Sequence, residues 1–242
     1  MKKLKWISGG LILLFTLNSC IYTDVNHNND SGGSVEEIFN VDSFDAVDVG
    51  SAMNVLIIPG TEFKVTANGR ERDVDDLNVR VLNATLKINY LHRNWLGAIN
   101  RKRMDILIET PVLEAIDASG ACRVDIEDFT GFDKLEADVS GASKLNLDAV
   151  AEELNITISG ASVFTAKKEC PYLSADLSGA SKLNAFDTNS DEVYLSLSGA
   201  SRANVSVRDY LKVDASGAST VNYRGTPRID QDVSGGSKVT ED

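Results

Sequence analysis

Histidine, cysteine and proline are scarce in this chain, and so are aromatic residues. The 242 residues include 2 His, 3 Cys and 4 Pro, and aromatic residues make up 7%. Two histidines and three scattered cysteines are too few for a zinc site or a disulfide framework, so we expect neither a metal nor a cofactor. Basic residues are also in deficit, at 24 against 36 acidic residues, and the net charge of -12 disfavours binding to nucleic acid.

Apolar residues, by contrast, are abundant enough to form a folded core. They make up 43% of the chain, which excludes disorder over its whole length. A chain of 242 residues with this composition fits one sizeable domain or two small ones.

The N-terminus has the features of an export signal. Lys2, Lys3 and Lys5 precede an apolar run, residues 7–17, that is too short to span a hydrocarbon core of ~30 Å. Residues 17–20, Leu-Asn-Ser-Cys, resemble a bacterial lipobox, in which a peptidase cuts before a cysteine that carries a lipid. We therefore expect a lipoprotein signal peptide at residues 1–19 and lipidation of Cys20. An ordinary cleaved signal followed by a chance cysteine is the alternative.

Residues 20–39 are expected to be a flexible tether between the lipid and the folded domain. The stretch 26–34 reads Asn-His-Asn-Asn-Asp-Ser-Gly-Gly-Ser and contains nothing to bury. A lipid on Cys20 would attach the protein to a membrane of the cell envelope. We expect this to be the outer membrane, on either its periplasmic or its external side.

A four-residue motif, Ser-Gly-Ala-Ser or a close variant, recurs at intervals of 18 to 21 residues. The flanking segments alternate apolar and polar residues, as in 135–139 and 143–147, which is the pattern of β-strands. Each copy therefore predicts one coil of a β-solenoid, with its glycine at a corner that stacks on the next corner. The copies begin at Ser119, Ser140, Ser159, Ser178, Ser198, Ser216 and Ser234.

The fold class that follows is all-β: a single-stranded β-helix, or β-solenoid, of right-handed sense. We expect one domain over residues 40–242, with about seven regular coils in residues 111–242. Residues 40–110 lack the motif but hold several strand-like runs, so irregular coils that form an N-terminal β cap are expected there. These runs are 54–58, 63–67, 77–81, 86–90 and 104–109.

The repeated serines do not predict a hydrolase. A catalytic serine needs a base, and the repeats contain neither a histidine nor a Gly-x-Ser-x-Gly elbow. Cys122 and Cys170 fall two coils apart, about 10 Å along the stack, and on different faces, so we expect two unpaired thiols.

The serial motifs, the opening segment 44–49 and the ending 223–227 before the last Ser-Gly-Gly resemble the head GIN domain of putative auto-transporter adhesins. The resemblance covers nearly all of the chain after the signal. It implies a β-helical fold and an envelope location in Bacteroidetes-type bacteria, and little about activity, because the function of that family is unknown. Cys122 departs from the motif, where most copies have Ser, without affecting the fold assignment.

Stacking converts sequence positions into columns on the surface. An acidic column stands two residues before the motif, interrupted by Thr157 and Ser196, and a basic column follows the motif. In the simplest interpretation the acidic and basic residues of each coil offset one another. The alternatives are cation binding by the adjacent pairs of aspartates, or saccharide binding by the Lys-x-Asn face that follows the motif. The adjacent pairs are Asp117 with Asp138 and Asp214 with Asp232.

One basic, aromatic-bearing stretch follows the tether, at residues 92–96 and 101–103. Its simplest interpretation is a protruding hairpin whose Trp95 packs on the cap. The alternative is a loop that binds a partner.

The sequence predicts a non-enzymatic, adhesin-like binding or scaffolding module of the cell envelope. The alternative is a carbohydrate-active enzyme on a β-helix scaffold, which rests on fold analogy alone. The expected partners are the membrane, through the lipid, and a glycan or an envelope protein. The free edge of the last coil, at residues 228–242, predicts a monomer or a weak tail-to-tail dimer. Candidate ligand-binding residues are Asp117, Asp138, Asp214, Asp232 and Trp95.

Overall fold

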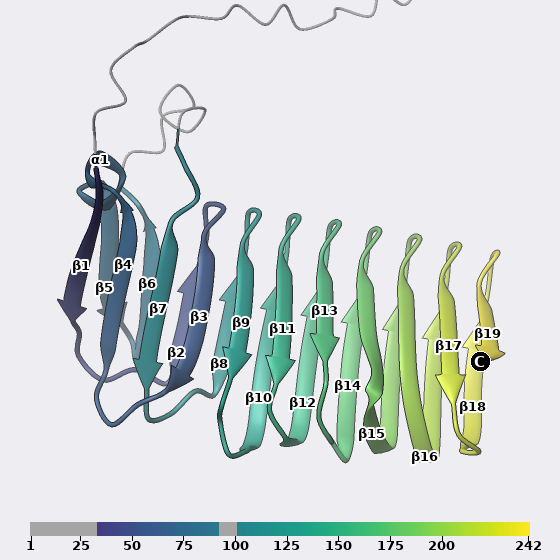
Figure 1. Ribbon diagram of the computed structural model, residues 1–242. Helices are drawn as coiled ribbons and strands as arrows, with labels where there is room; N and C mark the ends of the chain where they lie inside the picture. The colour runs from purple at the N-terminus through teal and green to yellow at the C-terminus, as the bar shows by residue number, and fades with distance from the viewer. Residues whose placement is uncertain (1–32, 92–100) are drawn as a thin grey trace, which may run out of the picture. The chain divides into compact units, whose positions relative to one another are not determined.

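Each repeat folds as one coil, made of a strand before the Ser-Gly corner and a strand after it (Figure 1). The computed structural model describes residues 33–91 and 101–242. The strands before the corners include β8 (Ala115–Ala118), β10 (Phe132–Val139), β12 (Ala151–Ile158), β14 (Tyr172–Leu177) and β18 (Arg228–Val233). The strands after the corners include β9 (Arg123–Glu127), β11 (Lys144–Asp148), β13 (Val163–Ala166), β17 (Thr220–Arg224) and β19 (Lys238–Glu241).

Two longer strands, β15 (Lys182–Leu197) and β16 (Arg202–Ala215), run through the second bend of their coils without a break. Their first halves therefore extend the sheet of strands that follow the corners, which we call the post-corner sheet. Their second halves extend the sheet of strands that precede the corners, the pre-corner sheet.

Successive coils pair in parallel and in register, so equivalent residues stand directly above one another. Asp138 pairs with Asp117, and Leu145 pairs with Phe164. The predicted all-β solenoid with its stacked coils is confirmed, and Figure 1 shows the Ser-Gly corners in a row. Because strand side chains alternate, every second residue points between the two sheets and forms one continuous apolar core.

The last serine of the motif points into this core. Ser143 and Ser162 are fully buried, and their hydroxyl oxygens accept hydrogen bonds from the backbone N–H groups of Cys122 and Ser143, at 3.2 and 3.3 Å. Cys122 takes the place of this serine in the first motif, where the buried Met53 is its counterpart in the preceding coil. The thiol thus lies where the polar serine column meets an apolar core.

The regular stack begins before the first Ser-Gly motif, which differs from the expectation of irregular coils up to residue 110. Strands β2 (Ala46–Val49) and β3 (Asn54–Pro59) pair in parallel with β8 and β9. Their corner is Gly50-Ser51-Ala52, in which Ser51 and Ala52 adopt positive φ angles of 73° and 62°. Glycine precedes serine here, so the sequence of this corner does not match the Ser-Gly motif.

Antiparallel strands close the N-terminal end of the stack. The strands are β4 (Lys64–Arg70), β5 (Leu77–Leu82), β6 (Thr85–Tyr90) and β7 (Asp105–Thr110), with the one-turn helix α1 (Glu71–Val74) between β4 and β5. β6 and β7 still pair in parallel with β2 and β3, but β5 and β4 pair antiparallel on their outer sides. The five strand-like runs predicted for this part correspond to β3 to β7.

The predicted tether, residues 20–39, includes a strand of the folded unit. β1 (Ser34–Asn40) pairs antiparallel with β4 over its whole length. Val35 and Phe39 pack against the core, so this strand has apolar contacts of its own. Cys20 lies outside the described residues.

The core is uncovered at the last coil. Every residue of β18 is exposed, and the core-facing Ile229 and Val233 keep 37% and 36% of their surface accessible. Val233 thus occupies the inward column as predicted, opposite the buried Ala215, although no further strand among the described residues covers it.

The glycine corners hold the register of the stack. The N–H of Ala180 donates to the carbonyl oxygen of Gly160 at 2.8 Å, so the hydrogen-bonded ladder continues through the corner. Gly179 has a φ of 76°, and a Cβ atom built on it would lie 2.6 Å from that same oxygen. The corner therefore excludes every residue with a side chain on two grounds, its backbone conformation and its contact with the neighbouring coil.

We predict that Gly179→Ala lowers the free energy of unfolding by about 2 kcal/mol or more, because left-handed strain adds to the clash. Chemical denaturation monitored by circular dichroism measures the change.

Gly236→Ala is the matched control. A Cβ atom there meets its nearest neighbour at 3.6 Å, and most other copies of the motif already have alanine at this place. We expect this change to raise the free energy of unfolding by about 0.4–1 kcal/mol, because alanine lowers the conformational entropy of the unfolded chain. Equal effects of the two substitutions would contradict the proposed role of the corner.

Candidate binding surfaces

The acidic column lies on the outer face of the pre-corner sheet and is longer than the sequence predicts. Asp48 pairs in register with Asp117, and Asp117 with Asp138, so three carboxylates follow one another on adjacent strands. Asp48 was missed because its corner lacks the Ser-Gly order. The alignment of Asp-Val-Gly-Ser-Ala at 48–52 with Asp-Ala-Ser-Gly-Ala at 117–121 is the signal that identifies it.

The charges of these three carboxylates are only partly compensated. Lys87 is in register with Asp48 and its Nζ lies 2.6 Å from Asp48 Oδ2. The pKa of Asp117 is raised, first by partial burial and then by the charges of Asp48 and Asp138, and Lys87 opposes the shift. In residues 33–91 and 101–242, no group of three or more His, Cys, Asp and Glu side chains is arranged to hold a metal ion.

The other candidate residues from the sequence are placed differently. Asp214 pairs with Asp232 on the last two strands of the same sheet, and both are exposed. They are separated from Asp117 and Asp138 by the coils that carry Thr157 and Ser196. Trp95 lies outside the described residues.

The basic column and the asparagine column lie on the opposite sheet from the aspartates. Lys144 pairs with Arg123, and no ion pair joins the basic and acidic columns in the part of the chain that the structure describes. The expectation that they offset each other within a coil is therefore wrong, because the two columns project from opposite faces. The carboxamides beside the basic column bond to one another instead, as Asn204 does to Asn184 at 3.2 Å and Asn222 to Asn204 at 2.8 Å.

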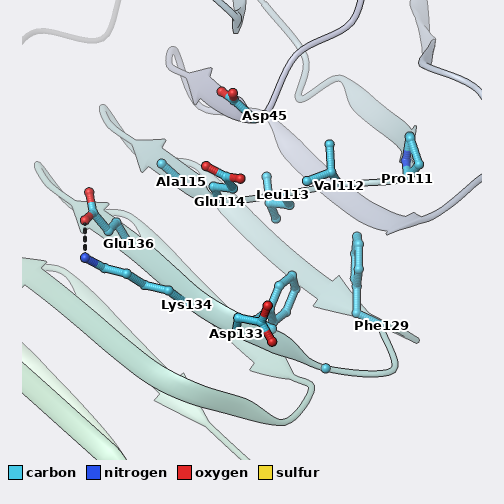
Figure 2. Close-up of a pocket in the computed structure, with 12 residues that line it drawn as sticks. Asp45, Pro111, Val112, Leu113, Glu114, Ala115, Phe129, Asp133, Lys134 and Glu136 are labelled. Carbon is cyan, nitrogen blue, oxygen red and sulfur yellow. Dashed lines mark ion pairs between the residues drawn. The ribbon is translucent and has the colours of Figure 1, made fainter.

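A groove of about 630 Å³ opens where the second bends of the first coils meet the pre-corner sheet (Figure 2). The chain segments 111–115 and 129–134 form its walls. Its apolar part includes Phe129 and the largely buried Phe132, whose ring centroids are 4.9 Å apart, and the exposed Val112. The repeat pattern does not predict this groove, because most of its residues belong to bends whose sequences do not repeat from coil to coil.

Acidic side chains surround the apolar part of the groove. Figure 2 labels Asp45, Glu114, Asp133 and Glu136 around it. Lys134 is the basic residue of the lining, and its Nζ lies 2.9 Å from Glu136 Oε1 and 3.5 Å from Glu153 Oε1. The lining therefore carries an excess of negative charge, which favours a cationic ligand.

The groove continues into the acidic column. A smaller hollow of about 190 Å³ shares Ala115 and Glu136 with the groove and is also lined by Asp48, Asp117 and Asp138. Two of the residues singled out from the sequence, Asp117 and Asp138, thus adjoin the groove. We call the groove and the column residues together the acidic groove surface.

The two described thiols are not nucleophiles. Cys122 and Cys170 are free and buried, as predicted for unpaired cysteines. Burial raises the pKa of Cys122 and raises that of Cys170 to about 12, so neither is ionised at neutral pH. His27 and His92 lie outside the described residues.

Comparison with known families and structures agrees with the fold. The family described as "putative auto-transporter adhesin, head GIN domain" matches residues 43–227. No curated protein matches the chain. Within the described residues, no helix is both long enough and apolar enough to cross a membrane.

Several solved structures share the fold. A putative adhesin from Bacteroides fragilis is 21% identical and aligns with a TM-score of 0.74 over 87% of this chain and 97% of its own. A putative adhesin from Parabacteroides merdae aligns with a TM-score of 0.68 at 15% identity, over 87% of this chain and 97% of its own. A protein from Parabacteroides distasonis described as putative lipid binding aligns at 0.69 and 17% identity over the same shares. At these identities the likeness concerns the fold.

The raised pKa of Asp117 makes the stability of the fold depend on pH. Because its pKa is raised, the folded state binds its proton more tightly than the unfolded chain does, so the ionised form lowers stability. We expect Asp117→Asn to raise the free energy of unfolding at pH 7 by about 0.2–1 kcal/mol, the range for opposed cross-strand pairs. The gain should shrink as the pH falls through the raised pKa of the folded state and should be lost below about 4, where aspartate is protonated in both states.

Asp176→Asn is the control, since Asp176 is in register with the uncharged Thr157 and Ser196. Denaturation midpoints across a pH series measure both effects. A gain for Asp176→Asn as large as that for Asp117→Asn would refute repulsion along the column.

Proposed function

The chain belongs to the head GIN domain family of putative auto-transporter adhesins, and from this premise we propose that it is a non-enzymatic, adhesin-like binding or scaffolding module of the cell envelope. Residues 1–19 act as a lipoprotein signal peptide, and the lipid on Cys20 anchors the mature chain to the outer membrane. The residues between Cys20 and β1 connect the anchor to the solenoid, which is the single domain of the mature protein.

The acidic groove surface is the observation that carries this proposal. The side chains of the asparagine column bond to their own neighbours. The groove instead combines apolar surface at the exposed Val112 and the half-buried Phe129 with carboxylates in excess of their basic partners. Such a surface suits a segment of an envelope protein that carries both apolar and basic side chains.

The enzyme alternative has no support in the described residues. Both thiols there are buried, and burial raises the pKa of each. Asp117 and Asp138 line a small hollow together with Lys87, whereas Asp214 and Asp232 are both exposed, and no observation on the described residues assigns a reaction to either pair. We therefore propose no reaction for this protein.

Lipid anchoring is tested by Cys20→Ser. We expect this variant to lose incorporation of radiolabelled palmitate and to leave the membrane fraction, because the only proposed attachment is lost. Cys122→Ser is the control: it restores the serine found at this place in most motifs, and it should keep both the label and the membrane location. Palmitate labelling that survives in Cys20→Ser would refute the anchor.

The groove is tested by reversing its charge. We expect the double variant Glu114→Lys and Asp133→Lys to lose most of the binding to outer-membrane proteins that the full mature chain captures. Added salt should weaken the wild-type interaction, because charges at a surface are screened within about 8 Å at physiological ionic strength. Quantitative pull-down followed by titration with each captured protein measures both effects.

The control for the groove is a double variant with the same change of charge, Asp187→Lys and Glu62→Lys, at exposed positions outside the groove and outside residues 228–242. It should bind as the wild type does. Equal loss in both double variants would show that net charge, and not the groove, governs binding, and no captured protein at all would refute the binding role of this surface.

For assembly, we propose that the lipid-free protein is a monomer or a weak tail-to-tail dimer through residues 228–242. The exposed core edge at Ile229 and Val233 is the surface that would pair. Sedimentation at several concentrations should show at most a weak dimer, which Ile229→Lys with Val233→Lys abolishes and Val150→Lys, at another exposed valine, does not. Extended polymers would refute the proposal.

A further inference from the structure

Three tyrosines gather on the outer face of the pre-corner sheet, and Tyr172 lies two strands from Lys134, a residue of the acidic groove surface in the same column. They belong to three consecutive strands: Tyr172 to β14, Tyr194 to β15 and Tyr210 to β16. Tyr172 is 52% exposed and Tyr194 is 40% exposed, which makes them conspicuous among the exposed large side chains of the described chain. The rings of Tyr194 and Tyr210 meet edge to face, with centroids 5.8 Å apart.

The solenoid itself does not require tyrosine at these positions. Tyr172 is in register with Glu153 on one side and Glu192 on the other, and Glu192 is in register with Tyr210. Tyr194 is in register with Ser174 and Lys212. Polar residues therefore fill the same columns in neighbouring coils, and the aromatic rings add exposed surface that a monomeric fold gains nothing from exposing.

Hydrogen-bonding groups surround the three rings. The hydroxyl of Tyr194 donates to Glu192 at 2.7 Å, and that of Tyr210 donates to Asp230 at 3.3 Å. Ser174 and Lys212 flank Tyr194 in its column, and Asp176 lies on the same strand as Tyr172. Arg228 Cζ lies 5.8 Å from the centroid of the half-buried Tyr210 ring, so Tyr172 and Tyr194 offer most of the exposed aromatic surface. Acceptors and donors lie within one or two strand spacings of these rings.

An ion-paired network holds the bends beside the rings. Arg208 donates through Nε to Asp191 at 2.6 Å and through Nη2 to Glu169 at 2.9 Å. These residues belong to the second bends of three consecutive coils, immediately before or close to the strands that carry the tyrosines. The rings are therefore presented on fixed backbone, which reduces the entropy that a ligand must remove on binding.

From this arrangement we propose that Tyr172, Tyr194 and Tyr210 form a platform that binds a neutral oligosaccharide, and we call it the tyrosine platform. The C–H groups on one side of a pyranose ring are attracted to the negative face of an aromatic ring, while the sugar hydroxyls require hydrogen-bond partners around it. Tyr172 and Tyr210 are two strand spacings apart, about 10 Å, a span that a disaccharide can cover.

The charge around the platform selects a neutral sugar. Glu153, Glu192, Asp176 and Asp230 lie beside the rings, against the basic Lys212 and Arg228. Carboxylates accept hydrogen bonds from neutral hydroxyl groups but repel uronic acids, sulfates and phosphates. The two surfaces adjoin at the ion pair between the groove residue Lys134 and Glu153, which is in register with Tyr172. The three rings themselves do not line the groove, so this proposal goes beyond the protein-binding role given above and does not depend on it.

An array of oligosaccharides tests the platform with the full mature chain in detergent. Its probes are neutral oligomers of glucose, mannose, galactose and N-acetylglucosamine, with oligomers of galacturonic acid for comparison. We expect binding to at least one neutral series and none to galacturonic acid. Calorimetric titration of a bound series should give about tenfold weaker affinity for Tyr172→Ala and for Tyr194→Ala, in line with the loss of one aromatic contact.

Tyr172→Phe is the matched control, because it keeps the ring and Tyr172 makes no side-chain hydrogen bond among those described. Its affinity should stay close to that of the wild type. The groove variant Glu114→Lys with Asp133→Lys should keep sugar binding, so a failure of the groove and a failure of the platform are distinguishable.

Three results would overturn the platform. They are the absence of binding to every neutral series, binding to galacturonic acid in place of neutral sugars, and sugar binding that Tyr172→Ala and Tyr194→Ala leave unchanged. Denaturation midpoints of the alanine variants that match the wild type would establish that any loss arises at the surface, since both side chains are exposed.

Discussion

The hydrogen bond between consecutive glycine corners is the constraint on which the rest of the structure depends. From the second Ser-Gly corner onward, the N–H after the corner glycine donates to the glycine carbonyl of the preceding coil at 2.7 to 3.2 Å; the donor is alanine except at the last corner, where it is Gly236. A side chain on the glycine would lie against that same oxygen. The corner therefore fixes three things together: the identity of the residue, the spacing of the coils and the register of every strand that leaves the corner.

Because the register is fixed, each sequence position forms a column of stacked side chains. The side chains of one column must therefore pack, bond or repel one another. Inward apolar residues stack into one core, and the buried serines bond to backbone groups of the neighbouring coil. Outward asparagines satisfy one another, because a carboxamide is both a donor and an acceptor. Outward aspartates have only acceptors, and the pKa of the central Asp117 is raised first by partial burial and then by the charges of Asp48 and Asp138 on either side. Thr157 and Ser196 interrupt the column further along.

The periodic part of the fold was predictable, because a constraint that repeats in space repeats in the sequence. The coils, the corner glycines, the inward residues and the unpaired cysteines all follow from the spacing of the motif. Asp48 was missed since Gly50 and Ser51 stand in the reverse order, and the backbone compensates with positive φ at Ser51. Strand β1 was missed because its partner β4 lies in the non-repeating cap, where register cannot be derived from a period.

The candidate binding surfaces were missed for a related reason: both lie by the second bends, where the structure tolerates variation. No repeating column of glycines governs these bends, although Gly225 has a positive φ and packs against the backbone of Val207 in the preceding coil. The bends therefore differ in length, and the register of β15 against β16 shifts between Ala185 and Glu192. The groove is built from the bends around Val112 and Phe129, and Tyr172 and Tyr210 begin the strand pairing just after their bends. A substitution at a corner disturbs every coil that depends on its register, whereas a substitution at a bend changes one local surface. Binding surfaces in this fold are therefore expected at the edge opposite the glycine corners, where residues are free to change without loss of the stack.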